Sequence, residues 1–367
     1  MRIGIVLHGP EIVDVGSAKK IIDIFKRDHN VIAKLGGTMG RTAVLDAELE
    51  DVIDISQGLT PSETINDLAH CIDLAILLNH GKTLETGRHF GRLVASKLKP
   101  SIPFIHIERP DSSGRVFYHD SRARYCAEYA RKILHDGNYD LTVEKESITP
   151  LYVRAEGNTI VRRICGAFPG ENIRLDGIVI GEVTGQDPEI VCRDGQVVEL
   201  RAGKIKPHGI EKLKNRSTDL FTARVKTGYI RRTRHSPRIK EVPRRISESV
   251  AVIIDHCAES TFELIRDANL VITIGDDTTS IASDILTRFG IPVIGITDGD
   301  LDCILEDAAV PAGSVIIRVR EGFDDIVGKK LSENLMEGRQ KISMQGDELT
   351  ARILALAEKY IVEVKYY

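Results

Sequence analysis

Two acidic loops in the C-terminal third of the chain carry residue types suited to metal chemistry. One loop follows the apolar run 271–274, and the other follows 291–297. Their aspartates are Asp276, Asp277, Asp298, Asp300 and Asp302. If the two strands are parallel neighbours, both loops line one crevice. Clustered carboxylates repel unless a cation neutralises them, and Mg²⁺ binds carboxylates together with phosphates. We interpret Asp277 as a catalytic base and the other four as Mg²⁺ ligands; the alternative is a solvated loop with Asx turns.

A glycine and three hydroxyl side chains accompany the first acidic loop, where a strand is predicted to lead into a helix over 278–289. They are Gly275, Thr278, Thr279 and Ser280. Helix N-termini at strand ends present amide groups to anions, so these residues are predicted to bind phosphate. The alternative is that one of the preceding aspartates is an ordinary N-cap and the hydroxyls help to start the helix.

A glycine-rich loop follows the strand predicted over 31–35. Gly36, Gly37 and Gly40 allow the backbone to approach a ligand, and Arg41 can hold phosphate through paired hydrogen bonds. The spacing matches neither the dinucleotide-binding nor the Walker A pattern. We predict an anion site here, with a plain turn as the alternative.

Polar residues stand at the ends of three other strands predicted in the first third of the chain. His8 follows one strand, His80 and Lys82 follow another, and Glu108 follows the third, so all four are candidates to face a crevice. Residues 81–83 read Gly-Lys-Thr, but Ile76 occupies the position of the first P-loop glycine, so no P-loop is predicted. We interpret His8 and His80 as catalytic candidates and Lys82 as a phosphate ligand; the alternative is that the histidines are structural.

The elements that position these residues predict an α/β fold. Apolar runs such as 74–78 alternate with amphipathic segments, which is typical of βαβ units with parallel strands. Between the two α/β regions, short alternating segments and an Asp-Gly at 194–195 predict hairpins. We expect two doubly wound, Rossmann-like parallel-sheet lobes with an inserted β-rich module. The predicted parts are an N-terminal lobe (1–140), the module (141–228), a basic linker (229–246) and a C-terminal lobe (247–367).

The composition limits the partners of the chain. Its 367 residues include 50 basic and 54 acidic side chains, a net charge of −4, and no tryptophan, so general nucleic-acid binding is not expected despite the basic linker. No apolar run is long enough for a bilayer and no signal-peptide pattern opens the chain, so we expect a soluble cytoplasmic protein without a membrane partner. The six cysteines lack CxxC spacing and are expected to be free thiols. The oligomeric state is left open.

Three resemblances add to these interpretations. The loop Asp298-Gly299-Asp300-Leu301-Asp302 resembles the Gly-Asp-(Phe/Leu)-Asp motif of thiamin pyrophosphokinases and is similar to the acidic loop of archaeal hydroxymethylpterin diphosphokinases, which implies aspartates that hold Mg²⁺ and ATP phosphates. Gly275-Asp276-Asp277-Thr278, with 290–295 downstream, resembles the nucleotide loop of phosphofructokinases, although that family's second glycine is missing. The whole chain, including the opening Ile5-Val6-Leu7-His8-Gly9-Pro10-Glu11, resembles an uncharacterised family of methanogenic archaea, which implies a cell type and no reaction.

Together these features predict a Mg²⁺-dependent enzyme that acts on a nucleotide such as ATP or on a phosphorylated metabolite, as a phospho- or diphosphotransferase. Positioning and electrostatics carry most of the catalysis of phosphoryl transfer, and an acidic metal site supplies both. Two alternatives stay open. One is a two-lobed enzyme resembling nucleotide-sugar transferases or epimerases. The other is a non-catalytic nucleotide- or metabolite-binding protein, or a cofactor-assembly protein of methanogens. The expected partner is a small phosphorylated ligand.

Overall fold

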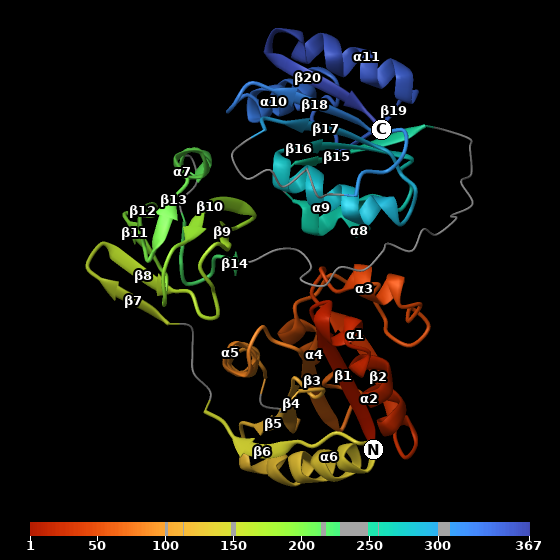
Figure 1. The fold of residues 1–367 in the computed structure, drawn as a ribbon, viewed down its shortest axis with the longest axis vertical. Helices are drawn as coiled ribbons and strands as arrows, with labels where there is room; N and C mark the ends of the chain where they lie inside the picture. The colour runs from red at the N-terminus through yellow and green to blue at the C-terminus, as the bar shows by residue number, and fades with distance from the viewer. Residues whose placement is uncertain are drawn as a thin grey trace. The chain divides into compact units, whose positions relative to one another are not determined.

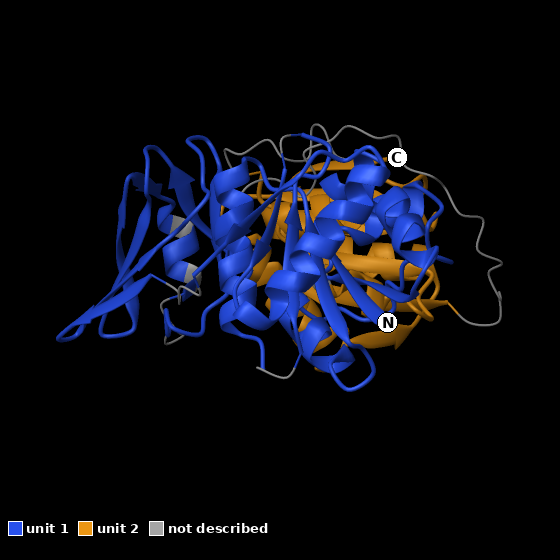
Figure 2. Ribbon diagram, turned by 90° about the horizontal axis from the view of Figure 1, so that it is seen from below, with its two compact units in different colours: residues 1–235 blue, residues 236–367 orange. Residues whose placement is uncertain are grey.

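The computed structural model describes residues 1–99, 102–112, 114–147, 152–213, 218–227, 249–255, 257–299 and 309–367. The chain divides into two compact units, residues 1–235 and 236–367 (Figure 2). The basic linker predicted over 229–246 lies outside the described residues, as do Asp300 and Asp302.

A six-stranded sheet organises the N-terminal part of the first unit. Its strands are β1 (Arg2–His8), β2 (Asn30–Gly36), β3 (Leu74–Asn79), β4 (Phe104–Glu108), β5 (Arg115–Tyr118) and β6 (Thr142–Lys145), in the order β2-β1-β3-β4-β5-β6. The first four are parallel, β5 is antiparallel to β4, and β6 is parallel to β5. Strand β3, Leu-Ala-Ile-Leu-Leu-Asn, is buried along its whole length because helices cover both faces of the sheet.

Helices lie on both faces of this sheet (Figure 1). The helices are α1 (Glu11–Asp14), α2 (Ser17–Lys26), α3 (Arg41–Asp46), α4 (Pro61–Leu68), α5 (Leu84–Ser96) and α6 (Arg124–Asp136), with a 3₁₀ turn η1 (Ser121–Ala123) before α6. Apolar side chains of α1, α2, α3 and α6 pack into one core, and those of α4 and α5 pack into a second core on the opposite face. The doubly wound arrangement follows from these two cores.

The β-rich module consists of two four-stranded sheets, in the orders β13-β10-β9-β14 and β12-β11-β8-β7. Its elements are β7 (Val153–Glu156), β8 (Thr159–Arg163), β9 (Asn172–Leu175), β10 (Ile178–Val183), β11 (Glu189–Arg193), β12 (Gln196–Arg201), β13 (Gly203–Ile205), α7 (Pro207–Leu213) and β14 (Val225–Thr227). Asp194 and Gly195 both have positive φ, 52° and 75°, in the β11–β12 hairpin. An Asp-Gly turn adopts this backbone readily. Strand β6 falls in the range predicted for the module but pairs with the first sheet.

The second unit holds another six-stranded sheet, in the order β19-β15-β16-β17-β18-β20. Its elements are β15 (Val250–Asp255), η2 (Ala258–Ser260), α8 (Thr261–Leu264), β16 (Leu270–Ile274), α9 (Asp276–Thr287), β17 (Val293–Thr297), β18 (Val315–Val319), α10 (Asp324–Asn334), β19 (Lys341–Ser343), α11 (Gly346–Ala357), η3 (Glu358–Tyr360) and β20 (Ile361–Tyr366). The four central strands are parallel, while β19 and β20 are antiparallel edges. The predicted α/β class is confirmed, but both large sheets are mixed where parallel sheets were expected.

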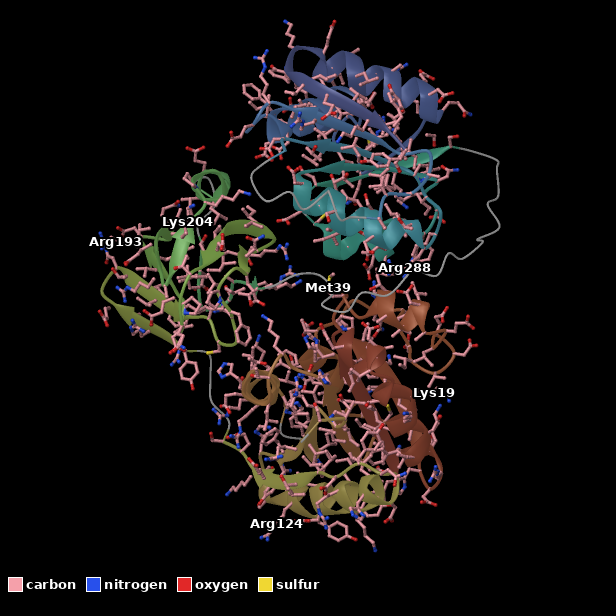
Figure 3. The ribbon with its side chains drawn as sticks, viewed as in Figure 1. Lys19, Met39, Arg124, Arg193, Lys204 and Arg288 are labelled. Carbon is pink, nitrogen blue, oxygen red and sulfur yellow. The ribbon has the colours of Figure 1, made fainter. Side chains whose placement is uncertain are left out.

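Helix α9 and helices α10 and α11 pack on opposite faces of the second sheet. Arg288 directly follows α9 and is 1% exposed (Figure 3). Its guanidinium donates to the Asp284 carbonyl and lies 3.0 Å from the Asp284 carboxylate, one helical turn earlier. Pairing with this carboxylate offsets the desolvation of the buried Arg288 charge. Arg288 therefore stabilises the C-terminal end of α9.

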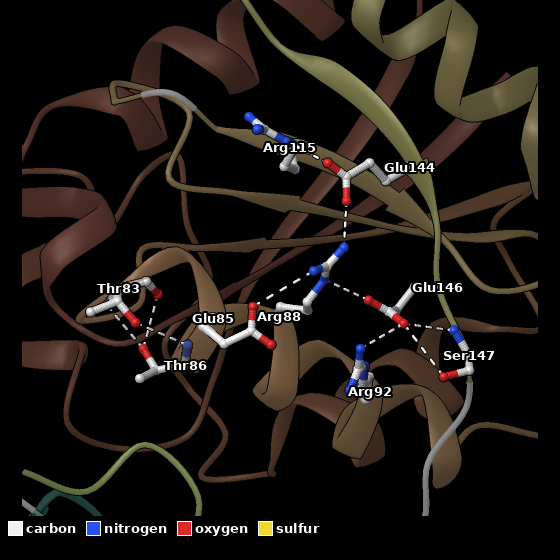
Figure 4. A network of polar contacts seen from close by, with 9 residues as sticks. All are labelled: Thr83, Glu85, Thr86, Arg88, Arg92, Arg115, Glu144, Glu146 and Ser147. Carbon is white, nitrogen blue, oxygen red and sulfur yellow. Dashed lines mark hydrogen bonds and ion pairs between the residues drawn. The ribbon is translucent and has the colours of Figure 1, made fainter.

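An ion-pair network joins α5 to β5 and to the end of β6 (Figure 4). Arg88 contacts Glu144 and lies 2.6 Å from Glu146, and Arg92 lies 2.8 Å from the same Glu146 carboxylate. Arg115 of β5 approaches Glu144 to 2.6 Å. Glu146 is 7% exposed, so its charge depends on these arginines for solvation.

Glu146→Gln is expected to destabilise the first unit by about 1 to 3 kcal/mol at neutral pH, because charge-assisted hydrogen bonds are lost. Burial raises the pKa of Glu146, but contacts from Arg92, Ser147 and Arg88 outweigh it and hold the pKa below its ordinary value. The stabilisation is therefore present above the unfolded pKa of about 4.3 and is lost as pH falls through the lower folded pKa. Urea unfolding should separate variant and wild type at pH 7, and the difference should shrink as the pH is lowered below about 4. Exposed Glu156→Gln is the control, and an equal effect of both substitutions would contradict the prediction.

Candidate functional site

The carboxyl ends of β16 and β17 lie side by side in the second unit. The two strands are parallel neighbours, as the acidic-loop hypothesis required, and α9 connects them. Gly275 follows β16 with a φ of 95°, a backbone conformation that glycine adopts without strain. Its amide donates to the Ile296 carbonyl across the strand pair at 2.9 Å. The turn therefore holds the start of α9 against the end of β17.

Asp276 and Asp298 are in direct contact at this edge. The amide of Asp298 donates to Asp276 Oδ2 at 3.2 Å, and Asp298 Oδ2 accepts from the Gly322 amide at 2.9 Å. Asp298 is buried, and Asp276 and Asp277 are half-buried in the first turn of α9. A carboxylate accepts about four bonds, so these amide contacts are compatible with cation binding. The structure thus brings together two of the four predicted metal ligands.

The other two predicted ligands, Asp300 and Asp302, fall in the segment for which the structure gives no description. Among the described residues, no group of three His, Cys, Asp or Glu side chains is placed to hold a metal ion. Mg²⁺ sites commonly use only one or two carboxylates, with water and substrate phosphate as the remaining ligands. The contact at this edge joins the Asp276 carboxylate to the backbone amide of Asp298, while the Asp298 carboxylate accepts from Gly322.

The three predicted phosphate-binding hydroxyls are buried at the start of α9. Thr279 Oγ1 donates to the Gly275 carbonyl at 2.8 Å and lies 2.8 Å from Thr273 Oγ1. A Cβ on Gly295 of β17 would lie 2.6 Å from the Thr279 methyl group. Thr279 therefore fastens α9 to both strands, a structural role that sets the position of Asp276. Thr278 and Ser280 are 4% and 6% exposed.

In the first unit, β1 lies between β2 and β3. The strand after β1 is therefore added on one side of it, and β3 and β4 are added on the other side, so the strand order reverses at β1. Ligands of open α/β sheets bind at the carboxyl ends of the strands beside such a switch. His8 ends β1 there, in register with Gly36 of β2 and Asn79 of β3. Its ring stacks on Phe90 of α5, with centroids 4.1 Å apart.

His8 is held in a defined orientation. Its Nδ1 lies 3.2 Å from the Gly36 carbonyl, which only accepts hydrogen bonds, so Nδ1 carries the proton and Nε2 is the acceptor in the neutral ring. Burial lowers the pKa of His8 and Lys226 lowers it further, while the Gly36 carbonyl, Glu11 and Glu108 oppose the change. His8 is therefore neutral at pH 7.

The glycine-rich loop after β2 is shaped by packing. A Cβ on Gly36 would lie 2.6 Å from Pro61 Cα, and one on Gly40 would lie 2.8 Å from the Gly9 carbonyl. Gly37 has a φ of 94°, and its amide donates to the Leu59 carbonyl at 2.7 Å. Arg41, predicted to hold phosphate, is fully buried at the start of α3. These close contacts and the positive φ of Gly37 explain why glycine occupies positions 36, 37 and 40 without a bound ligand being needed.

The loop after β3 is fixed by residues at the end of β4. Glu108 accepts from the Gly81 amide, and Arg109 Nη1 donates to the carbonyls of Gly81 and Lys82 at 2.6 and 3.0 Å. Arg109 has a φ of 46°, an unusual conformation for a residue with a Cβ and one that concentrates at functional sites. His80 lies 3.1 Å from Asp111 and is thus engaged in an ion pair when protonated.

Lys82 is directed to the β-rich module. Its Nζ donates to both carboxylate oxygens of Glu171 and, at 3.2 Å, to the Gly166 carbonyl. The ammonium also lies 5.4 Å from the centroid of the Phe168 ring. Lys82, which was predicted to bind phosphate, therefore holds the segment before β9 at the end of β3.

Comparison with known proteins gives a family match over nearly the whole chain. Residues 5–339 match the family described as "Uncharacterized protein conserved in archaea (DUF2117)". The chain belongs to this archaeal family. It is 42% identical over 339 residues to "Uncharacterized protein MJ0065" of Methanocaldococcus jannaschii, a match that covers 91% of this chain and 92% of that protein. The resemblance of the whole chain to an uncharacterised archaeal family is confirmed.

This member of the archaeal family contains a buried polar network that sequence reasoning did not assemble. Glu108 Oε2 accepts from Asn79 Nδ2 at 2.7 Å and lies 3.0 Å from His106 Nε2, and all three side chains are buried. Gly87 and Gly91, four residues apart in α5, make room for Glu108 and His106. Glycines inside a predicted helix were the available signal.

Within the described parts of the chain, no helix is both long and apolar enough to cross a membrane.

Proposed function

We propose that this chain is a Mg²⁺-dependent enzyme that acts on a nucleotide such as ATP or on a phosphorylated metabolite, as a phospho- or diphosphotransferase. The contact between Asp276 and Asp298 at adjacent strand ends supports the proposal. Two carboxylates at that position provide hard oxygen ligands where α/β sheets bind phosphates. The family description names no reaction.

The residues divide the chemistry in the following way. Asp276 and Asp298 would hold Mg²⁺, which neutralises phosphate charge when bound. Asp277, beside Asp276 in the first turn of α9, would accept the proton of the attacking group. Gly275 and Thr279 keep both aspartates in place, because the turn and the hydroxyl tie α9 to the ends of β16 and β17. Preorganised charge of this kind is the main source of rate in phosphoryl transfer.

Calorimetric titration with ATP, with and without Mg²⁺, tests the proposal. Wild type is expected to bind only with Mg²⁺, and Asp298→Asn is expected to weaken binding at least tenfold, since one metal-ligating charge is removed. Asparagine still accepts from the Gly322 amide, so the fold should persist, and circular dichroism checks this. Asp347→Asn, in the first turn of α11, is the matched control. Binding of ATP and other phosphorylated ligands that is independent of divalent ions in wild type would reject the metal site.

A further inference from the structure

A second set of polar residues meets at the carboxyl end of the first sheet, and the β-rich module supplies part of it. The contact of Lys82 with Glu171 and Gly166 holds the module at the end of β3. A Cβ on Gly166 would lie 3.1 Å from Thr86 of α5, so the backbone of the module comes close to the first lobe here. The module thus contributes residues at the end of β3, the strand beside β1.

The paired strands β9 and β14 carry cationic side chains on one face of their sheet. Lys226 of β14 is the register partner of Arg174 of β9, so their side chains share a face. Arg224 lies two residues before Lys226, a spacing that returns to the same face of an extended chain. Lys226 and Arg224 are exposed and Arg174 is half-buried. These three residues are called the cationic face below.

The cationic face belongs to the part of the module that the contact between Lys82 and Glu171 holds at the first sheet, because β9 begins directly after Glu171. Burial is the main cause of the lowered pKa of His8, and the charge of Lys226 contributes to it. Hydrogen bonds from Thr60 are the main cause of the lowered pKa of Glu63, at the start of α4, and the charge of Arg224 adds to it. Charges act in this way only over short distances near a protein surface. Two charges of the cationic face, Lys226 and Arg224, therefore act on His8 and Glu63 of the first lobe.

We propose that the carboxyl end of β1 binds a phosphate-bearing small molecule, with the cationic face as its counter-charge, and that His8 takes up a proton at Nε2 as the ligand binds. The groups that face His8 are Glu11 of α1, Glu108 of β4, Lys226 of β14, the Gly36 carbonyl of β2 and the Phe90 ring of α5. A dianion added to this set favours the imidazolium, because opposite charges within a few ångströms stabilise each other. Nε2 then donates to a phosphate oxygen, while Nδ1 keeps its bond to Gly36.

The site lies in the first unit and does not use the aspartates of the second. It therefore goes beyond the proposed function, and either proposal can fail without the other. Omitting Mg²⁺ from the experiment keeps them apart, and Asp298→Asn should behave as wild type in it.

Titration of the full chain with inorganic phosphate, without Mg²⁺ and in two buffers of different ionisation enthalpy, tests the inference. The expected result for wild type at pH 7.5 is binding with net proton uptake. Lys226→Met should weaken binding at least tenfold. The matched control is Lys204→Met, an exposed lysine on β13 at the opposite edge of the same module sheet (Figure 3). Both substitutions are on exposed side chains, so folding should be unaffected.

His8→Gln should retain weakened binding but lose the proton uptake, because glutamine does not titrate. Proton uptake that persists in His8→Gln, equal phosphate binding by Lys226→Met and Lys204→Met, or no binding by wild type would each overturn the proposal. Malonate, a dicarboxylate, tests whether the site prefers phosphate over carboxylate ligands. Malonate that binds as tightly as phosphate would assign the site to carboxylates and reject the phosphate assignment.

Discussion

Gly87→Ala is expected to destabilise the first unit by about 3 kcal/mol, with loss of the ordered loop after β3. A Cβ at position 87 would lie 2.0 Å from Glu108 Cδ and 2.2 Å from both of its carboxylate oxygens. Glu108 is fully buried and bonded to Asn79 and Gly81, so its side chain has no low-cost alternative position. Overpacking of a core costs about 1 to 3 kcal/mol, and broken charge-assisted bonds add to that cost.

The helix propensity of alanine opposes this loss. Alanine in a helix interior is favoured over glycine by about 1 kcal/mol, which is less than the expected strain. Hydrogen exchange of peptides from β3 and β4 should show the loss, and the melting temperature should fall by about 6 to 12 °C. Exposed Glu85→Ala in the same helix is the control. A Gly87→Ala protein as stable as wild type would show that Glu108 can leave its buried position cheaply.

Much of the fold could be predicted from local patterns. The apolar runs of β1, β3 and β16 and the Asp-Gly turn at 194–195 were sufficient signals, because they depend on residues adjacent in the chain. The mixed character of the first sheet was also within reach. Only residues 109–114 separate β4 from β5. A parallel crossover needs about a dozen residues or more, so that connection permits only an antiparallel pair.

The sites were predicted unevenly for the same reason. Asp276 and Asp298 could be brought together in advance, because one helix joins their strands and parallel neighbours end at one edge. The pairing of Lys82 with Glu171 joins residues 89 positions apart, and the influence of Lys226 on His8 spans even more of the chain. Such contacts depend on how the module packs on the first lobe, and no local pattern specifies that packing.

The first unit is expected to lose about 2 kcal/mol of stability between pH 6.5 and pH 5 through His119 alone. Burial lowers the pKa of His119 to about 4, with His106 and Arg92 adding to the shift and Glu146 and Ser147 opposing it. An unfolded histidine titrates near pH 6.5. Between these values the unfolded chain binds a proton that the folded chain does not, so stability falls as pH decreases.

His119→Phe separates this contribution from the other groups. Phenylalanine keeps a ring against Phe104, whose centroid lies 5.6 Å from that of His119, but it cannot titrate. Urea unfolding at pH 6.5 and pH 5, followed by hydrogen exchange of β4 peptides, should show a pH-dependent loss about 2 kcal/mol smaller in the variant than in wild type. The lowered pKa values of His8 and His89 leave a residual slope in both proteins. Exposed His135→Phe is the control, and an unchanged slope in His119→Phe would mean that His119 is solvated enough to protonate in the folded unit.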